Sequence, residues 1–155
     1  MRTNRRLTVP IGTCLLCADM NGLRCVARGD VVYALLSCRS GAKAPGFFTP
    51  PETELQVGIV DYAAGYLAKP HAHRPPTASI DRVCEVLFVE NGKIEVQIFD
   101  EAWGVLAVDV LSQGDCVVFI RGGHSVRMLE PTRLVEVKQG PYPGDGLAKS
   151  FLATP

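Results

Sequence analysis

The chain has 155 residues, which is enough for one domain with a substantial core and too few for two. Hydrophobic residues make up 47% and charged residues 21% of the sequence, and this composition excludes a disordered chain. The 16 basic and 16 acidic residues give a formal net charge of zero, which argues against a protein that binds nucleic acid or a membrane surface.

The first twenty residues bear on targeting. Arginines precede an apolar stretch, as in a secretory signal peptide, but Pro10, Gly12 and Asp19 interrupt that stretch. The interruption argues against a signal peptide. We expect residues 1–10 to form a flexible arm. No apolar run has the length of a transmembrane helix, so the sequence predicts a cytoplasmic protein.

Short runs of β-type residues separated by turn residues fill most of the chain, and no long segment has helical periodicity. Asn21-Gly22 and Asn91-Gly92 each lie between two such runs, and this dipeptide favours the turn of a β-hairpin. The spacing predicts an all-β sandwich or barrel over residues 11–142, followed by a tail at 143–155. The expected strands cover residues 13–20, 23–28, 31–38, 55–62, 66–69, 83–89, 93–99, 105–111, 116–120, 125–129 and 134–138.

Six cysteines lie mostly within apolar runs, at positions 14, 17, 25, 38, 84 and 116. Without a secretory signal they are expected to be reduced residues of the core. Cys14 and Cys17 have the spacing of a metal or redox motif, which is the alternative for that pair.

All three histidines of the chain and one glutamate form a candidate metal site. His71 and His73 are separated by one residue, so in an extended strand their side chains point to the same face. Glu85 and His124 occupy later strands at positions whose neighbours on the same face are apolar, which directs both side chains inward. Imidazole and carboxylate ligands suit a divalent first-row transition metal, which also satisfies polar groups placed in a core.

The spacing around these residues resembles the cupin superfamily. Five residues separate Gly65 from His71-Ala-His73, and six residues separate Glu85 from Gly92, as in the first cupin motif. The gap between the second histidine and the glutamate is longer here than in the usual motif. We therefore expect residues 74–84 to bulge outward before the chain re-enters the barrel.

The second cupin motif has a counterpart in Gly114-Asp115 and in the segment that ends at His124, with Ile120 where proline is usual. Gly122-Gly123 is expected to form a tight turn that leaves the histidine unobstructed. The resemblance covers residues 54–142 and implies a double-stranded β-helix, or jelly-roll barrel, with an N-terminal β-hairpin extension. It also implies a divalent metal (Fe²⁺, Mn²⁺, Ni²⁺, Co²⁺ or Zn²⁺) held by His71, His73, Glu85 and His124.

Such a site favours a small metal-dependent enzyme. Four protein ligands leave positions open for a substrate, as a dioxygenase or a Lewis-acid isomerase or lyase requires. A narrow barrel suits a small polar metabolite that chelates the metal. Two alternatives stay open: a non-catalytic module that binds a small metabolite or sugar, and a metal-free sugar-nucleotide epimerase-like enzyme with His71 or His73 as its base.

Lys138, Arg82 and Gln56 are further candidates for catalytic residues. Lys138 alternates with Val135 and Val137 along its strand, so the two kinds of side chain face opposite ways. If the valines face the core, the lysine lies on the outer surface. In the reversed register it points to the metal, where it binds a carboxylate or donates a proton.

The expected partners are a small-molecule substrate and a second copy of the chain. Jelly-roll sheets have exposed edges, and pairing them between subunits is a common way to cover them. The hairpin expected at residues 13–28 is the element most suited to extend a neighbour's sheet, so we expect a homodimer.

Overall fold

The computed structural model describes residues 16–20, 23–39, 45–73, 80–141 and 143–152. The arm expected at residues 1–10 and the side chains of Cys14 and Cys17 lie outside this description. Within the described ranges, no helix is long and apolar enough to cross a membrane.

The described residues form strands at most of the places that the sequence predicts. The exceptions are residues 55–62, which form only a two-residue strand, and residues 66–69, which form none. The strands are β1 (Leu16–Met20), β2 (Leu23–Arg28), β3 (Val31–Ser37), β4 (Gly46–Phe47), β5 (Gly58–Ile59), β6 (Glu85–Asn91), β7 (Lys93–Phe99), β8 (Val105–Ser112), β9 (Cys116–Phe119), β10 (Gly123–Met128) and β11 (Arg133–Lys138); the helix α1 spans Asp145–Ala148.

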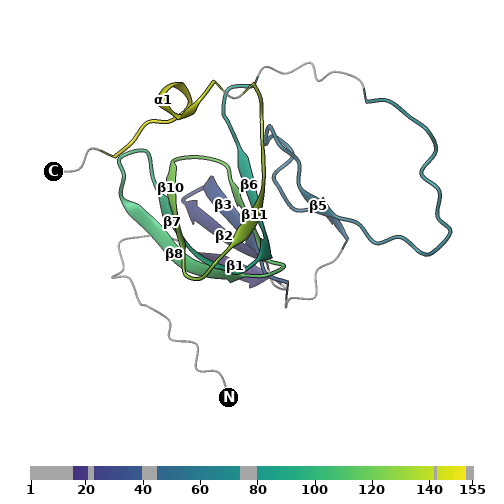
Figure 1. Cartoon of the computed structure of the whole chain (residues 1–155). Coiled ribbons are helices and arrows are strands. Elements are labelled where there is room, and N and C mark those ends of the chain that lie inside the picture. Colours follow the sequence, from purple (N-terminus) through teal and green to yellow (C-terminus); the bar gives the residue numbers. More distant parts are fainter. Residues whose placement is uncertain (1–15, 21–22, 40–44, 74–79, 142, 153–155) are drawn as a thin grey trace.

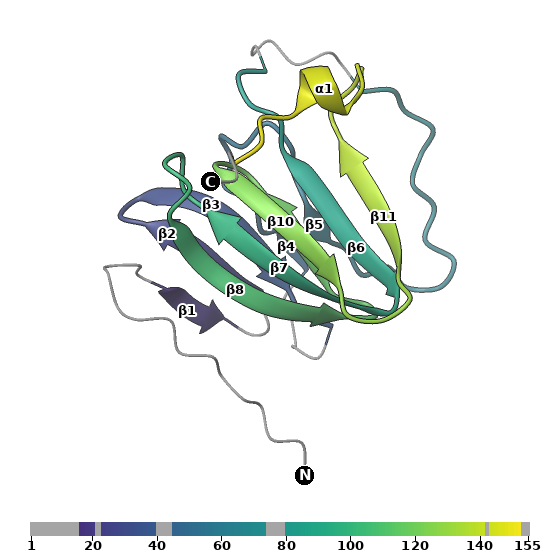
Figure 2. The same ribbon diagram turned by 60° about the vertical axis from the view of Figure 1, so that its left-hand side comes forward.

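Two antiparallel sheets face each other in the molecule (Figures 1 and 2). The six-stranded sheet has the order β1-β2-β3-β9-β6-β11, and the three-stranded sheet has the order β10-β7-β8. Strands β4 and β5 form a separate pair. The all-β prediction is confirmed. In the described part of the chain, however, no strand pairing joins the two sheets into a closed barrel.

The core lies between these sheets. On β7 every second side chain is buried and the intervening ones are more exposed, which is the period of a strand with one face covered. The fully buried aliphatic residues of the core come from both sheets: Val26, Leu36, Val89, Ile94, Val96, Ile98, Leu111 and Val117.

The first predicted hairpin is confirmed, since β1 pairs antiparallel with β2. Strand β2 also pairs with β3, so the hairpin extends the chain's own six-stranded sheet. This leaves β1 as the edge strand of that sheet.

The second predicted hairpin, at Asn91-Gly92, is wrong. The turn connects β6 in one sheet with β7 in the other, and these two strands do not pair. Gly92 has φ +95°, and a Cβ there would lie 2.5 Å from Oγ1 of Thr132 and 2.6 Å from the carbonyl oxygen of Pro131. The glycine is therefore required by the close approach of the neighbouring β10–β11 connection. The dipeptide marks a turn but does not determine which strands pair.

Candidate functional site

Glu85 and His124 come from opposite sheets and meet between them. Nε2 of His124 lies 3.5 Å from Oε1 of Glu85. Glu85 begins β6 and His124 lies near the start of β10, so the two residues are far apart in the chain. Both side chains are partly buried, with 17% of the glutamate and 30% of the histidine exposed. The inward orientation expected for both residues from strand alternation agrees with this arrangement.

A cavity of about 360 Å³ opens beside this pair, and we call it the histidine cavity. Polar side chains line it together with apolar side chains of β6, β10, β11 and the C-terminal segment. Its lining consists of Glu85, Leu87, His124, Ser125, Val126, Met128, Leu134, Glu136, Lys149 and Phe151. A concave surface with a few convergent polar groups is the usual form of a small-molecule site.

The surroundings of the pair fix its geometry and its charge. The imidazole of His124 stacks on the buried ring of Phe119. His124 lowers the pKa of Glu85 below its usual value; Lys138 and Lys149 act in the same direction, and burial opposes them. Glu85 is therefore a carboxylate at neutral pH, able to bind a cation or to accept hydrogen bonds.

The β6–β11 register determines the direction of Lys138. Lys138 lies directly opposite Glu85, and two residues paired in this way point to the same face of the sheet. Val135 and Val137 are 45% and 49% exposed, so the valines face outward. Of the two registers that the sequence allowed, the structure therefore has the one in which the lysine lies on the side of the candidate site.

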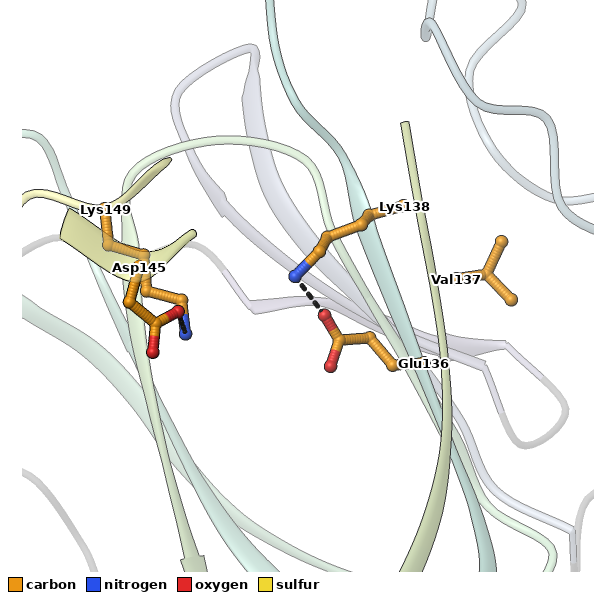
Figure 3. Close-up of a pocket in the computed structure, with 5 residues that line it drawn as sticks. All are labelled: Glu136, Val137, Lys138, Asp145 and Lys149. Atoms are coloured by element: carbon orange, nitrogen blue, oxygen red, sulfur yellow. Dashed lines mark hydrogen bonds and ion pairs between the residues drawn. The ribbon is translucent and has the colours of Figure 1, made fainter. Parts of the chain in front are cut away.

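A second cavity, of about 660 Å³, adjoins the first, and we call it the lysine cavity. Glu136 and Lys149 line both cavities. Lys138 forms an ion pair with Glu136, and Lys149 forms one with Asp145 at 2.8 Å. Figure 3 shows these side chains extending toward one another, while Val137 points away.

The C-terminal contribution to the site was not predicted. Lys149 and Phe151 lie in a segment whose sequence has weak periodicity and no recognisable motif. The strand pattern indicated where β6 and β10 direct their side chains, but no sequence signal placed the tail next to them.

His71 and His73 lie apart from the Glu85–His124 pair. Residues 60–73 are all exposed and form no strand, and the segment arches away from the sheets (Figure 1). The strand expected before the histidines is therefore absent, because these residues have no partner strand and no core to cover them. The two imidazole centroids are 5.1 Å apart.

The structure thus brings together two of the four expected metal ligands. Across the described residues, no group of three or more His, Cys, Asp or Glu side chains is placed to hold a metal ion. The tautomer of His71 still fits a ligand: Nδ1 lies 2.7 Å from the carbonyl oxygen of Lys69 and must donate to it. In the neutral ring this hydrogen bond leaves the lone pair on Nε2, which is the form that binds a metal.

Arg82 and Gln56 lie outside the lining of both cavities. Nε of Arg82 donates to Oε1 of Glu54 at 2.8 Å. The Gln56 amide donates to the carbonyl oxygens of Pro50 and Thr53 at 2.9 and 3.0 Å. Both side chains thus hold together the connection that leads to β5 and β6.

Gly122 and Gly123 allow close packing beside His124. A Cβ at Gly122 would lie 2.1 Å from the carbonyl oxygen of Phe99, and one at Gly123 would lie 2.6 Å from the ring of Trp103. The two glycines are therefore needed for the approach of the β7–β8 connection, in addition to forming a turn.

Comparisons of the chain with models of protein families, with curated proteins and with solved structures found no match.

Proposed function

We propose that the protein is a small cytoplasmic cupin-type enzyme that uses a divalent transition metal to act on a small, metal-chelating polar metabolite. The convergence of Glu85 and His124 is the observation that supports this proposal. The two residues belong to separate motifs and separate sheets, yet their side chains meet at a cavity. A carboxylate and an imidazole in this arrangement form half of a mixed oxygen and nitrogen metal site.

His71 and His73 are the proposed remaining ligands. The proposal requires segment 60–73 to bring these two imidazoles to the histidine cavity. Every residue from 60 to 73 is exposed, so few contacts have to break when the segment moves. The hydrogen bond from Nδ1 of His71 to the Lys69 carbonyl oxygen supports the same role, because it leaves Nε2 of the neutral ring available to a metal.

The chain's own residues have defined parts in this proposal. Phe119 holds the imidazole ring of His124, and the ionised Glu85 supplies negative charge. Leu87 and Val126 contribute apolar side chains to the lining of the cavity. The metal, when bound, supplies a Lewis acid that holds and polarises the oxygens of a chelating substrate.

A homodimer belongs to the same proposal. Strand β11 ends the six-stranded sheet, and no described strand pairs with its outer edge. The neighbouring outer face carries Phe88, Val135 and Val137, each between 41% and 49% exposed. An unpaired edge beside exposed apolar side chains favours self-association. We expect sedimentation at micromolar concentration to give a dimer, and a monomer there would contradict this part of the proposal.

Metal titration of protein without a histidine tag tests the metal site. We expect about one Mn²⁺, Fe²⁺, Co²⁺, Ni²⁺ or Zn²⁺ per chain, and an affinity that falls about tenfold or more in Glu85→Gln, His124→Ala and the double variant His71→Ala/His73→Ala. Glu90→Gln is the matched control, because Glu90 lies on the same strand but pairs with Arg133. A folded wild-type protein with no affinity for any of these ions would overturn the proposal.

A metal-free enzyme is the second candidate, and the contact between Glu85 and His124 is the observation that favours it. A carboxylate beside an imidazole orients the ring for proton transfer. This arrangement meets the need of an epimerase-like enzyme for a base with an acidic partner, with His124 as the base in place of His71 or His73. Turnover of a sugar nucleotide that persists after metal removal would support this candidate. For such a substrate, the affinity would also fall steeply with salt.

A further inference from the structure

The C-terminal segment forms one wall of both cavities although it belongs to neither sheet. Lys149 lines both cavities, Phe151 lines the histidine cavity, and Asp145 lines the lysine cavity. The segment runs over the end of the sandwich at which β11 ends (Figures 1 and 2). It therefore places a cation and an aromatic ring next to Glu85 and His124.

This segment is held by few buried contacts. The helix α1 has no buried residue, and its N-cap Gly144 makes no side-chain capping hydrogen bond. Phe151 lines the histidine cavity but is 72% exposed. An aromatic ring in this position loses further contact with water when a ligand fills the cavity below it, so the ring favours the occupied state.

Two ammonium groups lie on different walls of the lysine cavity. Lys138 comes from β11 and Lys149 from the C-terminal segment (Figure 3). Each has a carboxylate partner, Glu136 or Asp145, in a solvent-accessible ion pair of a kind that contributes little to stability. An ammonium group has three donor hydrogens, so one lysine can hold its partner and a ligand oxygen at the same time.

We propose that the lysine cavity binds the carboxylate group of a small organic anion between Lys138 and Lys149, and that Phe151 covers the part of the anion that reaches into the adjoining histidine cavity. This inference deepens the proposed function, because it names an anionic class for the metabolite and rests on that function for the reaction. The anion binding itself uses only residues of the chain and is expected without a metal. Glu136 and Lys149 line both cavities, so a ligand held in the lysine cavity can extend into the histidine cavity.

Malonate is a suitable probe because it is small and carries two carboxylates. We expect it to bind saturably to protein freed of metal on a chelating resin, followed by NMR, with shifts centred on β11 and residues 145–151. The affinity should fall about tenfold or more in Lys138→Met and in Lys149→Met, and the neutral analogue malonamide should not bind. Lys93→Met is the matched control, since Lys93 is an exposed lysine outside both cavities and should bind malonate as the wild type does.

The variant Phe151→Ala tests the covering role of the aromatic ring separately from the charges of Lys138 and Lys149. We expect this variant to bind malonate more weakly than the wild type while keeping the wild-type dependence on salt. The lysine variants should instead lose part of that salt dependence. Lys149 lies outside the sheets, so Lys149→Met tests the proposal even if Lys138→Met disturbs β11.

Equal malonate affinity in the wild type and both lysine variants would overturn this inference, as would binding of malonamide or an equal loss in Lys93→Met. None of these results depends on metal binding by Glu85 and His124. Conversely, a protein that binds no divalent ion but binds malonate through the two lysines would overturn the metal proposal and support this one.

Discussion

The imidazole of His124 lies flat on the ring of Phe119, with ring centroids 3.9 Å apart and planes inclined by 6°. Phe119 ends β9 in the six-stranded sheet, is 4% exposed and belongs to the core, whereas His124 lies on β10 of the other sheet. One face of the histidine thus rests on the core while Nε2 remains directed at Glu85. A functional side chain held by a buried neighbour keeps one orientation before a ligand binds.

Replacing Phe119 with leucine removes this support while keeping an apolar core residue. We expect Phe119→Leu to lower the free energy of unfolding by about 1–2 kcal/mol and to weaken metal binding, because the imidazole ring of His124 gains freedom. Urea denaturation and metal titration measure the two effects. Phe99→Leu is the control, since Phe99 is also buried but contacts Trp103. Equal metal affinity in the two variants would show that the stack does not position the histidine.

The buried face of β8 offers a test of the sandwich core. Leu111 is fully buried between the sheets, and its neighbour Val110 is 44% exposed. We expect Leu111→Ala to cost about 2–5 kcal/mol of unfolding free energy, because the substitution leaves a cavity. Val110→Ala should cost less than about 1 kcal/mol. Denaturation of both variants checks the prediction, and similar losses would contradict the orientation of β8.

The sequence predicted the strands and their buried faces well, because alternation is a local property. The inward direction of Glu85 and His124 followed from their apolar neighbours two residues away. Alternation did not place His71 and His73 in the same way, because these residues form no strand. Alternating residues form a strand only where another strand pairs with them, and residues 60–73 have no such partner in the structure.

Features that depend on contacts between residues far apart in the chain could not be predicted from local sequence patterns. The side of the sheet to which Lys138 points follows from its pairing opposite Glu85, which no pattern within one strand reveals. The separation of β6 and β7 into different sheets likewise follows from their pairing with strands that come later in the chain. Lys149 lines both cavities only because the C-terminal segment turns back over the sandwich.

A glycine can be required by a positive φ or by the close approach of another segment, and a comparison of Gly92 with Gly65 distinguishes the two reasons. Both have positive φ, +95° and +83°, but only at Gly92 would a Cβ collide with a neighbouring segment. We expect Gly65→Ala to cost at most about 1 kcal/mol, because the exposed segment 60–73 can relax the backbone strain, and Gly92→Ala to cost clearly more. Thermal unfolding of both variants measures the difference. Equal losses would mean that the connection at Thr132 moves aside freely.

Asp100 and Asp109 are expected to change the pH dependence of stability in opposite directions. The pKa of Asp100 is held below its usual value of 3.8 mainly by its hydrogen bond from the Gly104 backbone N–H, with further help from Arg28 and from the N–H of Ala102. A depressed pKa gives stability that is present above pH 3.8 and is lost as the pH falls through the folded-state value.

Burial raises the pKa of Asp109 above 3.8, although Arg24 opposes the shift. The folded state therefore favours the protonated side chain, and stability declines as the pH rises from 3.8 toward the folded-state value. On acidification from about pH 7 to about pH 3, Asp100→Asn should lose less stability than the wild type, and Asp109→Asn should lose more. Urea denaturation across this range measures both. Each asparagine removes one titrating group and leaves the other in place. If both variants lost more stability than the wild type on acidification, or both lost less, the environments assigned to Asp100 and Asp109 would be contradicted.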